Sequence, residues 1–451
     1  MNETLEISRS REPSSTNVEV RRDKPRIVIV GGGFGGIAAA KALRHCDAEV
    51  VVIDRRNHHI FQPLLYQVAT AVLAPSEVAA PIRQLEAKQK NVSVLLAEVV
   101  GVDLESRSVD ANCPGLGIKK IGFDYLVVAA GMQSSYFGHD EYARYAPCLK
   151  TITDAETIRS KILSAYELAE STDDADERQR QMTFVLVGGG PTGVELAASL
   201  AQLAATTLRR NFRRIDPATT TIILLDGANR ILPSFAESLS KKAAGHLAKL
   251  GVQVITGAMV ERIDDRGVTV TGKLIRCGAV LWTAGVSPSP IVNMLGVATD
   301  RAGRACVSPS LSVPNVPGVF VVGDTATLMQ NGKPLPGVAQ VAIQQGRYVG
   351  RFISKELSGR KPPRPFRYFD KGNMAVVGKN FAVMESGRIR VAGLTAWFAW
   401  AFIHLLFLPQ LQSRLRVERQ WIWTYFTGQR SSRLVTEAPR FSRLPAPTVR
   451  G

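Results

Sequence analysis

Two glycine-rich turns, each placed directly after a strongly apolar stretch, constrain the fold of this chain more than any other feature. The first runs from Gly31 to Gly36 after RIVIV (26–30), and the second runs from Gly188 to Gly193 after FVLV (184–187). Each turn leads into an Ala- and Leu-rich helix and then into a second apolar strand that ends in Asp. Strands of continuous Val, Ile and Leu that alternate with helices indicate parallel sheets covered on both faces. Because the two turns begin 157 residues apart, the sequence predicts an α/β fold with an internal duplication.

Both turns fit the pattern G-x-G-x-x-G, which is typical of a dinucleotide-binding loop. Gly31 permits a tight turn, Gly33 lets the backbone approach a pyrophosphate, and Gly36 lets the helix pack closely on the strand. The same three positions in the second copy are Gly188, Gly190 and Gly193. The free N–H groups at the N-terminus of the following helix favour phosphate. We therefore expect two Rossmann-like domains, the first holding a flavin dinucleotide and the second admitting a nicotinamide dinucleotide.

An acidic residue closes the strand after each loop. Asp54 lies 18 residues past Gly36, and Asp226 ends TIILLD in the second copy. A carboxylate in this position accepts hydrogen bonds from ribose hydroxyls and repels a 2′-phosphate, so NADH is expected rather than NADPH. Arg230, four residues past Asp226, would soften that preference.

The charge balance favours an anionic partner. The 451 residues include 56 Lys and Arg against 39 Asp and Glu, a net charge of +17. Nucleic acid, an acidic membrane surface and phosphorylated ligands all fit this sign. No nucleic-acid-binding motif accompanies the charge, so nucleic acid is not expected as a partner.

Cysteine and histidine spacing gives no sign of a metal site. The five Cys are far apart and include no C-x-x-C pair, which excludes a zinc ribbon and a disulfide framework. His58 and His59 are adjacent, but no acid or Cys near them has ligand spacing. We expect these two side chains to pack or hydrogen-bond near the flavin, and we expect no metal.

One C-terminal stretch raises the question of a membrane. Residues 391–408 contain no Asp, Glu, Lys or Arg, and as a helix they would reach about 27 Å, just short of the ~30 Å hydrocarbon core. Pro409 closes the stretch, and the following segment mixes Trp, Tyr and Phe with Arg, which is typical of the headgroup region. Residues 409–451 carry eight Arg and two Glu, a net charge of +6. We expect monotopic binding to an anionic membrane surface; a transmembrane span and a helix buried in a homodimer stay open as alternatives.

Several longer segments resemble type II NADH dehydrogenases, the single-chain, non-proton-pumping NADH:quinone oxidoreductases of the respiratory chain. These are glutathione-reductase-like flavoproteins with two dinucleotide-binding domains. The matching segments are NHHIFQPLLYQVATAVLAPSEVAAPIR (57–83), GGGPTGVELA (188–197), LWTAGV (281–286), AQVAIQQG (339–346) and the aromatic C-terminal segment. The resemblance covers about residues 25–430 and implies tightly bound FAD, NADH as substrate, quinone as acceptor and a place on the cytoplasmic face of the cell membrane.

The resemblance also assigns roles to individual residues. Glu195 would be the acid beside the nicotinamide, although an acid in the first turn is favourable in any helix. Gln340 and Gln344, four residues apart and so on one helical face, would lie where the flavin meets the quinone. Lys371 would either face the reduced quinone or be an ordinary surface lysine. The expected cofactor-binding set is Gly31, Gly33, Phe34, Gly36, Asp54, Gly131, Gly323 and Asp324 for FAD, and Gly188, Gly190, Gly193 and Asp226 for NADH.

The expected domain organisation follows from these motifs. It comprises a disordered tail (1–24), a discontinuous FAD-binding domain (25–145 and 287–360), an NADH-binding domain (146–286), a membrane-associating module (361–430) and a basic tail (431–451). Three other functions stay open: a sulfide:quinone oxidoreductase, a soluble reductase of a small electron-carrier protein, and a binding or sensor protein. Sulfide oxidation is disfavoured because residues 307–451 contain no Cys.

Overall fold

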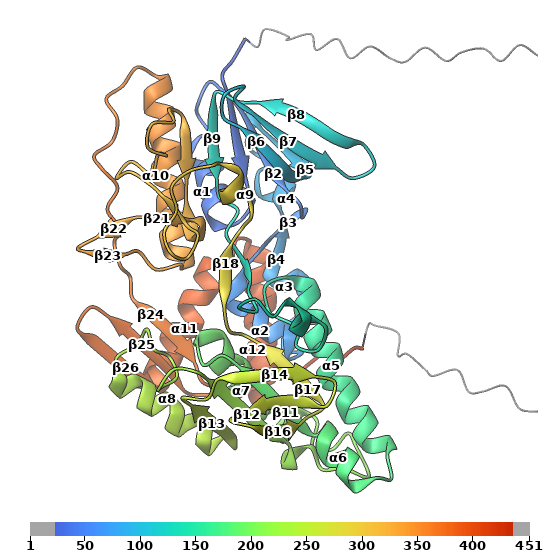
Figure 1. Cartoon of the computed structure of the whole chain (residues 1–451). Helices are drawn as coiled ribbons and strands as arrows, with labels where there is room; N and C mark the ends of the chain where they lie inside the picture. Colours follow the sequence, from blue (N-terminus) through green and yellow to red (C-terminus); the bar gives the residue numbers. More distant parts are fainter. Residues whose placement is uncertain (1–22, 436–451) are drawn as a thin grey trace, which may run out of the picture.

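The computed structural model describes residues 23–435, so most of the two predicted tails (1–24 and 431–451) lies outside the described residues. The described part consists of two sheet-centred units and a smaller C-terminal unit (Figure 1). The first sheet lies in the upper part of Figure 1 and the second in the lower part.

The first sheet has five parallel strands in the order β20-β9-β1-β2-β5. These strands are β1 (Arg26–Val30), β2 (Glu49–Asp54), β5 (Val92–Leu96), β9 (Tyr125–Val128) and β20 (Val319–Val321). The Val and Ile side chains of β1 and β2 are buried, as expected for a sheet covered on both faces. Strand β20 joins this sheet after the chain has formed the whole second sheet, so the first unit is discontinuous in sequence.

Two helices cover one side of the first sheet at very close range. α1 (Phe34–Ala42) packs against α10 (Ala339–Leu357). A Cβ atom at Gly350 would lie 2.7 Å from the carbonyl oxygen of Ala39, so the helices can approach this closely only because Gly350 has no side chain.

The second sheet repeats the arrangement of the first with four parallel strands in the order β13-β12-β11-β17. The strands are β11 (Thr183–Val187), β12 (Thr221–Asp226), β13 (Val252–Thr256) and β17 (Ala279–Trp282), and the main helices are α5 (Ile152–Ser171), α7 (Pro191–Gln202) and α8 (Glu237–Lys249). In both units the glycine-rich turn follows a central strand, β1 or β11, at the carboxyl edge of the sheet. The predicted α/β fold with two Rossmann-like units is confirmed.

Each unit also carries a three-stranded antiparallel sheet. In the first it is formed by β6 (Glu98–Asp103), β7 (Ser108–Cys113) and β8 (Gly117–Gly122), and in the second by β14 (Val260–Asp264), β15 (Gly267–Val270) and β16 (Lys273–Arg276). The strands β10 (Met132–Ser134) and β18 (Val286–Pro288), which connect the two units, pair antiparallel. Shorter elements are β3 (His58–Ile60), α2 (Leu65–Ala69), α3 (Pro75–Val78), β4 (Ala79–Pro81), α4 (Ile82–Leu85), α6 (Ala175–Gln181), α9 (Ile291–Met294), β19 (Ala305–Cys306), β21 (Ala326–Thr327), β22 (Met329–Gln330) and β23 (Lys333–Pro334).

The C-terminal unit is a three-stranded antiparallel sheet followed by two helices. Its elements are β24 (Asn373–Val376), β25 (Ala382–Ser386), β26 (Ile389–Gly393), α11 (Leu394–Phe407) and α12 (Leu411–Thr427). The apolar stretch 391–408 is therefore only partly helical, because its first three residues belong to β26. Within residues 23–435, no helix combines the length and the apolar character needed to cross a bilayer.

Candidate functional site: two dinucleotide cradles and the cavity between them

In the first glycine-rich loop, two glycines leave no room for a side chain, whereas a third faces open space where a ligand could bind. Gly31 has φ +107°, and a Cβ atom there would lie 2.8 Å from the carbonyl carbon of Ala129. At Gly36 a Cβ atom would overlap the carbonyl oxygen of Gly31. Gly33 has an ordinary φ of −79°, and no protein atom lies within 4 Å of its Cβ position. The space in front of Gly33 therefore fits a phosphate group at the N-terminus of α1.

The second loop has the same geometry. Gly188 has φ +112°, and a Cβ atom there would lie 2.6 Å from the backbone nitrogen of Ala284. Gly193 is packed against Gly188 and against Thr283, whose Oγ1 would be 2.8 Å from an added Cβ. Gly190, with φ −69°, has no protein atom within 4 Å of its Cβ position. Both loops thus fit a pyrophosphate at the position of the second glycine of the G-x-G-x-x-G motif.

The predicted acids Asp54 and Asp226 hold the loops in shape. Asp54 Oδ2 accepts a hydrogen bond from the N–H of Gly32 (2.6 Å), and Asp226 Oδ2 accepts one from the N–H of Gly189. Each carboxylate is therefore fixed at the edge of its crevice. The expected hydrogen bonds from a ribose to these carboxylates remain a prediction. The guanidinium of Arg230 donates to two backbone carbonyls in residues 233–235, at 2.8 and 2.7 Å, so the fold itself uses its donors.

The remaining predicted flavin residues lie around the carboxyl edge of the first sheet. Gly323 and Asp324 form a single 3₁₀ turn directly after β20, and the N–H of Gly323 donates to Oε1 of the buried Gln345 (2.6 Å). Burial raises the pKa of Asp324, and the nearby ammonium group of Lys150 opposes that rise. Gly131 follows β9 with φ +67° and open space at its Cβ position. Sequence reasoning did not find Gln345 or Lys150, which reach the site from α10 and from the start of the second unit.

The ring of Phe34 packs beside the first loop. Its ring lies edge-on to His59 (4.9 Å between centroids) and to Phe61 (6.0 Å). His59 is buried with Nδ1 3.1 Å from the carbonyl oxygen of Gly32, and burial lowers its pKa to about 4. A neutral imidazole therefore supports the loop. His58 pairs with Asn57 through its Nδ1, at 2.8 Å.

A cavity of about 130 Å³ lies between the two crevices. Its walls include Tyr66 from α2, Lys150, Thr192 and Glu195 from α7, and Trp282 from β17. Glu195 is buried, and its Oε1 accepts a hydrogen bond from the N–H of Val376 at 3.3 Å. Burial raises the pKa of Glu195 to about 8, with a smaller opposing effect of that hydrogen bond. At neutral pH this carboxyl group is therefore mostly protonated.

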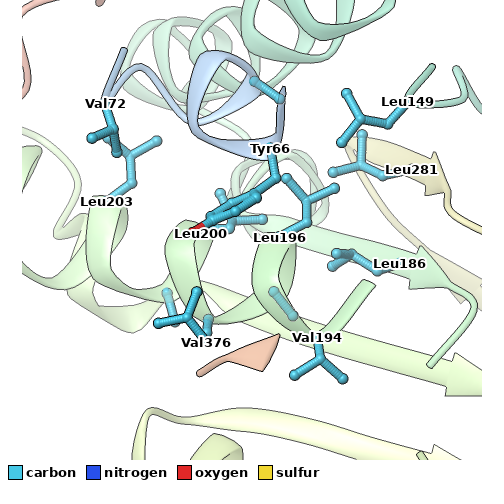
Figure 2. Packing of buried hydrophobic residues seen from close by; sticks show 14 of the residues in the cluster. Tyr66, Val72, Leu149, Leu186, Val194, Leu196, Leu200, Leu203, Leu281 and Val376 are labelled. Atoms are coloured by element: carbon cyan, nitrogen blue, oxygen red, sulfur yellow. The ribbon is translucent and has the colours of Figure 1, made fainter. Parts of the chain in front are cut away.

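Tyr66 connects the cavity to the C-terminal segment. Its ring lies over α7 beside Leu196 and Leu200 (Figure 2). Its hydroxyl accepts a hydrogen bond from Gln67 Nε2 (2.9 Å), and Gln67 Oε1 in turn accepts one from the indole N–H of Trp421 (2.7 Å). The phenol has a pKa far above the usual range, mainly because of burial and also because of the charge of Glu195.

Arg430 is a buried basic residue that contacts both α7 and the residue after α2. It is only 4% exposed and donates to the carbonyl oxygens of Thr70 (2.8 Å) and Ser199 (2.9 Å). It has no carboxylate partner in the described part of the chain, and burial lowers its pKa to about 9. Arg430 thus ties the end of the C-terminal unit to both α2 and α7. Sequence reasoning placed this arginine at the end of the membrane-associating module (361–430) and gave it no role of its own.

The predicted quinone-side residues lie on α10 and on the segment that follows it. Gln344 makes two hydrogen bonds with the backbone of Phe369, donating to its carbonyl (2.9 Å) and accepting from its N–H (3.0 Å). Gln340 lies one turn earlier on the same helix and is partly buried. Lys371 is exposed, with its ammonium group 5.6 Å from the ring centre of Phe407 in α11. Gln344 and Lys371 are thus brought to the junction of α10 and α11.

The cysteines and potential metal ligands lie apart from these groups. All five cysteines are free. Across residues 23–435, no three His, Cys, Asp or Glu side chains are grouped in a way that could hold a metal ion.

Known proteins are similar to this chain in both sequence and fold. The sequence model of the pyridine nucleotide-disulphide oxidoreductase family matches residues 25–346. The chain is 43% identical over 429 residues to the type II NADH:quinone oxidoreductase Ndh of Mycobacterium tuberculosis, covering 93% of this chain and 92% of that protein. It is 41% identical to NdhA of the same organism, over 96% of this chain and 93% of that one.

A solved structure supports the same fold. NDH2 from Plasmodium falciparum in complex with NADH matches with a TM-score of 0.82 and 21% identity, over 90% of this chain and 99% of that chain. These similarities favour the first prediction over sulfide oxidation, reduction of a soluble carrier and a sensor role. The chain therefore belongs to the pyridine nucleotide-disulphide oxidoreductase family and, within it, to the type II NADH:quinone oxidoreductases, as the resemblance predicted.

Proposed function

We propose that this protein oxidises NADH with bound FAD and reduces a membrane quinone without pumping protons. The observation that carries the proposal is the pair of equivalent cradles, with Gly33 and Gly190 open to ligand. Glu195 lines a cavity beside α7, the helix that begins at the second cradle. When bound, FAD supplies the chemistry by accepting a hydride from NADH and releasing two electrons to the quinone.

The first crevice would hold FAD. Gly33 and the N-terminus of α1 suit its pyrophosphate, Asp54 its ribose, and Asp324 the chain leading to its ring. The proposed FAD-binding domain (25–145 and 287–360) encloses these groups, and the membership of β20 in the first sheet supports its discontinuity. The NADH-binding domain (146–286) would admit NADH along Gly190 and Asp226.

Glu195 would act in the cavity as a neutral hydrogen-bonding group. Its raised pKa of about 8 keeps a proton on the carboxyl group at pH 7. A protonated carboxyl can donate to the nicotinamide amide without placing a negative charge beside the transferred hydride. The hydrogen bond from the N–H of Val376 to Oε1 holds this carboxyl group in place.

The quinone would approach between α10 and α11. The two hydrogen bonds of Gln344 to Phe369 hold the segment that carries Lys371 against α10. The ammonium group of Lys371 near Phe407 would then supply positive charge beside a reduced quinone. Gln340, one turn closer to the start of α10, would line the same approach.

The C-terminal helices would lie in the membrane interface. Each has a row of exposed apolar side chains: Leu394, Phe398, Phe402 and Leu406 on α11, and Leu411, Leu415, Ile422 and Phe426 on α12. Such rows, with Arg residues between them, suit monotopic binding to an anionic leaflet. We place the protein on the cytoplasmic face of the cell membrane, where NADH is available. A homodimer that covers the same rows is the alternative.

Anaerobic spectroscopy tests the reaction. NADH should bleach the yellow flavin of the purified protein, and a short-chain quinone should then restore the colour. A colourless protein, or a bleached flavin that quinone fails to reoxidise, would contradict the proposal.

Surface variants test the membrane step separately. Phe398→Ser with Phe402→Ser changes side chains that are 58% and 63% exposed, so the fold should persist while binding to vesicles falls. Leu116→Ser with Ile118→Ser, two exposed residues at the β7–β8 turn, is the matched control. Equal vesicle binding by both double variants would speak against α11 as the membrane face.

A further inference from the structure

A second, larger cavity lies away from the two crevices. It is half open to solvent, has a volume of about 660 Å³, and is lined by Lys41 and Arg44 at the end of α1, by residues 84–89 from the end of α4 onward, and by residues 409–412 at the junction of α11 and α12. This volume is ample for a small polar group.

The cavity is lined by uncompensated positive charge. Lys41 and Arg44 come from the end of α1, and Lys88 comes from the opposite wall. All three are exposed, and none forms an ion pair within the described residues. Glu86 is the one acid in the lining; it is 5% exposed, and its Oε1 has no hydrogen-bond partner. Three cations against one buried carboxyl group leave the cavity net positive.

The third wall places the cavity at the proposed membrane interface. Residues 409–412, at the junction of α11 and α12, carry no charge and lie between the two rows of exposed apolar side chains. Leu411 belongs to both features: it lines the cavity, and it begins the apolar row of α12 with 70% of its surface exposed. A molecule in this cavity would therefore have a cationic wall on one side and apolar side chains directly beside it.

We propose that this cavity binds the phosphate-bearing headgroup of an anionic phospholipid, with its acyl chains lying along Leu411 and the apolar row of α12. Lys41, Arg44 and Lys88 surround the phosphate. A soluble phosphate ester has the same polar chemistry, but it has no apolar chain that could contact the exposed Leu411. The inference rests on the proposed membrane attachment and adds a specific lipid site to it.

Vesicle flotation of the full-length, FAD-loaded protein tests the site. The probes are phosphatidylcholine vesicles with and without 30% phosphatidylglycerol. The test variant is Lys41→Gln/Arg44→Gln/Lys88→Gln. Each cation near an anionic surface contributes about fivefold to binding, so the triple change should weaken binding to the anionic vesicles roughly 100-fold. Its NADH oxidation with a water-soluble quinone should stay within twofold of the wild type.

The matched control removes the same charge from exposed positions outside the C-terminal unit. It is Lys119→Gln/Lys273→Gln/Lys333→Gln, and it should weaken binding less than tenfold. A loss of equal size in the two triple variants would mean diffuse attraction and would overturn the headgroup site. If the wild type binds neither kind of vesicle, the membrane attachment itself is wrong, while the reaction of NADH with flavin would still stand.

A soluble probe separates the two sources of phosphate. Titration with glycerol phosphate in the absence of vesicles should give a dissociation constant weaker than about 1 mM, because the acyl chains are missing. Tighter binding that the Lys41→Gln/Arg44→Gln/Lys88→Gln variant abolishes would assign the cavity to a soluble ester and overturn the lipid assignment.

Discussion

At each pH, the free energy of unfolding of Glu195→Gln can be compared with that of the wild type. This difference should favour the variant more strongly at pH 7 than at pH 5. Burial raises the pKa of Glu195 from 4.5 to about 8. Between these values the unfolded chain has already lost the proton that the folded chain retains. Wild-type stability therefore falls as the pH rises from about 4.5 to about 8 and changes little above that range.

The size of the effect follows from the pKa shift. At 1.36 kcal/mol per pKa unit, the full shift corresponds to about 5 kcal/mol. As the pH rises, the wild type should have lost about 1 kcal/mol of stability by pH 5 and about 3 kcal/mol by pH 7. Glutamine keeps the acceptor for the N–H of Val376 but cannot ionise, so the stability of the variant minus that of the wild type should increase by about 2 kcal/mol from pH 5 to pH 7.

Urea unfolding of the FAD-loaded protein at pH 5, 6 and 7, followed by tryptophan fluorescence, measures this difference. Glu105→Gln, a change of an exposed carboxylate, is the control and should show a flat difference. A flat profile for Glu195→Gln would refute a buried carboxyl group with a raised pKa. The same variant should retain flavin but oxidise NADH at least tenfold more slowly; wild-type turnover would remove Glu195 from the site.

Three further changes probe other parts of the site. Asp226→Arg should shift the ratio of kcat/KM values from NADH toward NADPH. Asp226→Asn, which can still accept a hydrogen bond from the N–H of Gly189, controls for loop stability. An unchanged ratio in Asp226→Arg would mean that the ribose binds elsewhere. Arg430→Met should lower the free energy of unfolding by about 2–4 kcal/mol, because buried acceptors lose a charged donor. In denaturation curves, Arg430→Lys should lose less stability than Arg430→Met. Unchanged stability of Arg430→Met would contradict the burial of this side chain. Gln344→Ala should raise the KM for quinone several-fold by releasing Phe369, with the NADH half-reaction unchanged in stopped-flow absorbance; a slower NADH half-reaction would argue against a quinone-side role.

The sequence was most informative where function depends on short-range geometry. The roles of Gly31, Gly33 and Gly36 are decided within six residues, by steric contacts with the neighbouring strand and by the space left for a ligand. The second copy repeats the same local solution. Both loops and the strands before and after them could therefore be predicted from spacing alone.

Long-range contacts were not predictable in this way. Arg430 reaches Thr70 across 360 positions of the chain, and no local pattern marks the pair. On α10, Gln344 and the adjacent Gln345 differ in role because of helical phase: one contacts Phe369 and the other Gly323. Only the packing of α10 on α1 determines that phase.

The apolar C-terminal stretch shows a different limit. Residues 391–393 are as apolar as those that follow, but Gly393 pairs with Ala382 in the sheet, so the helix begins one residue later. Hydropathy cannot distinguish a strand end from a helix start. The predicted 18-residue helix is therefore shorter in the structure, at 14 residues.

The central claim, that the first cradle holds the flavin and the second delivers NADH, is tested most directly by Gly33→Val and Gly190→Val. Both positions have an ordinary backbone conformation and open space around Cβ, so the added side chain disturbs the ligand rather than the fold. Flavin content and anaerobic bleaching by NADH are measured for each variant. Gly33→Val should be folded and colourless, whereas Gly190→Val should be yellow but bleach at least tenfold more slowly. A yellow Gly33→Val, or a Gly190→Val that NADH bleaches at the wild-type rate, would contradict the assignment of the two crevices.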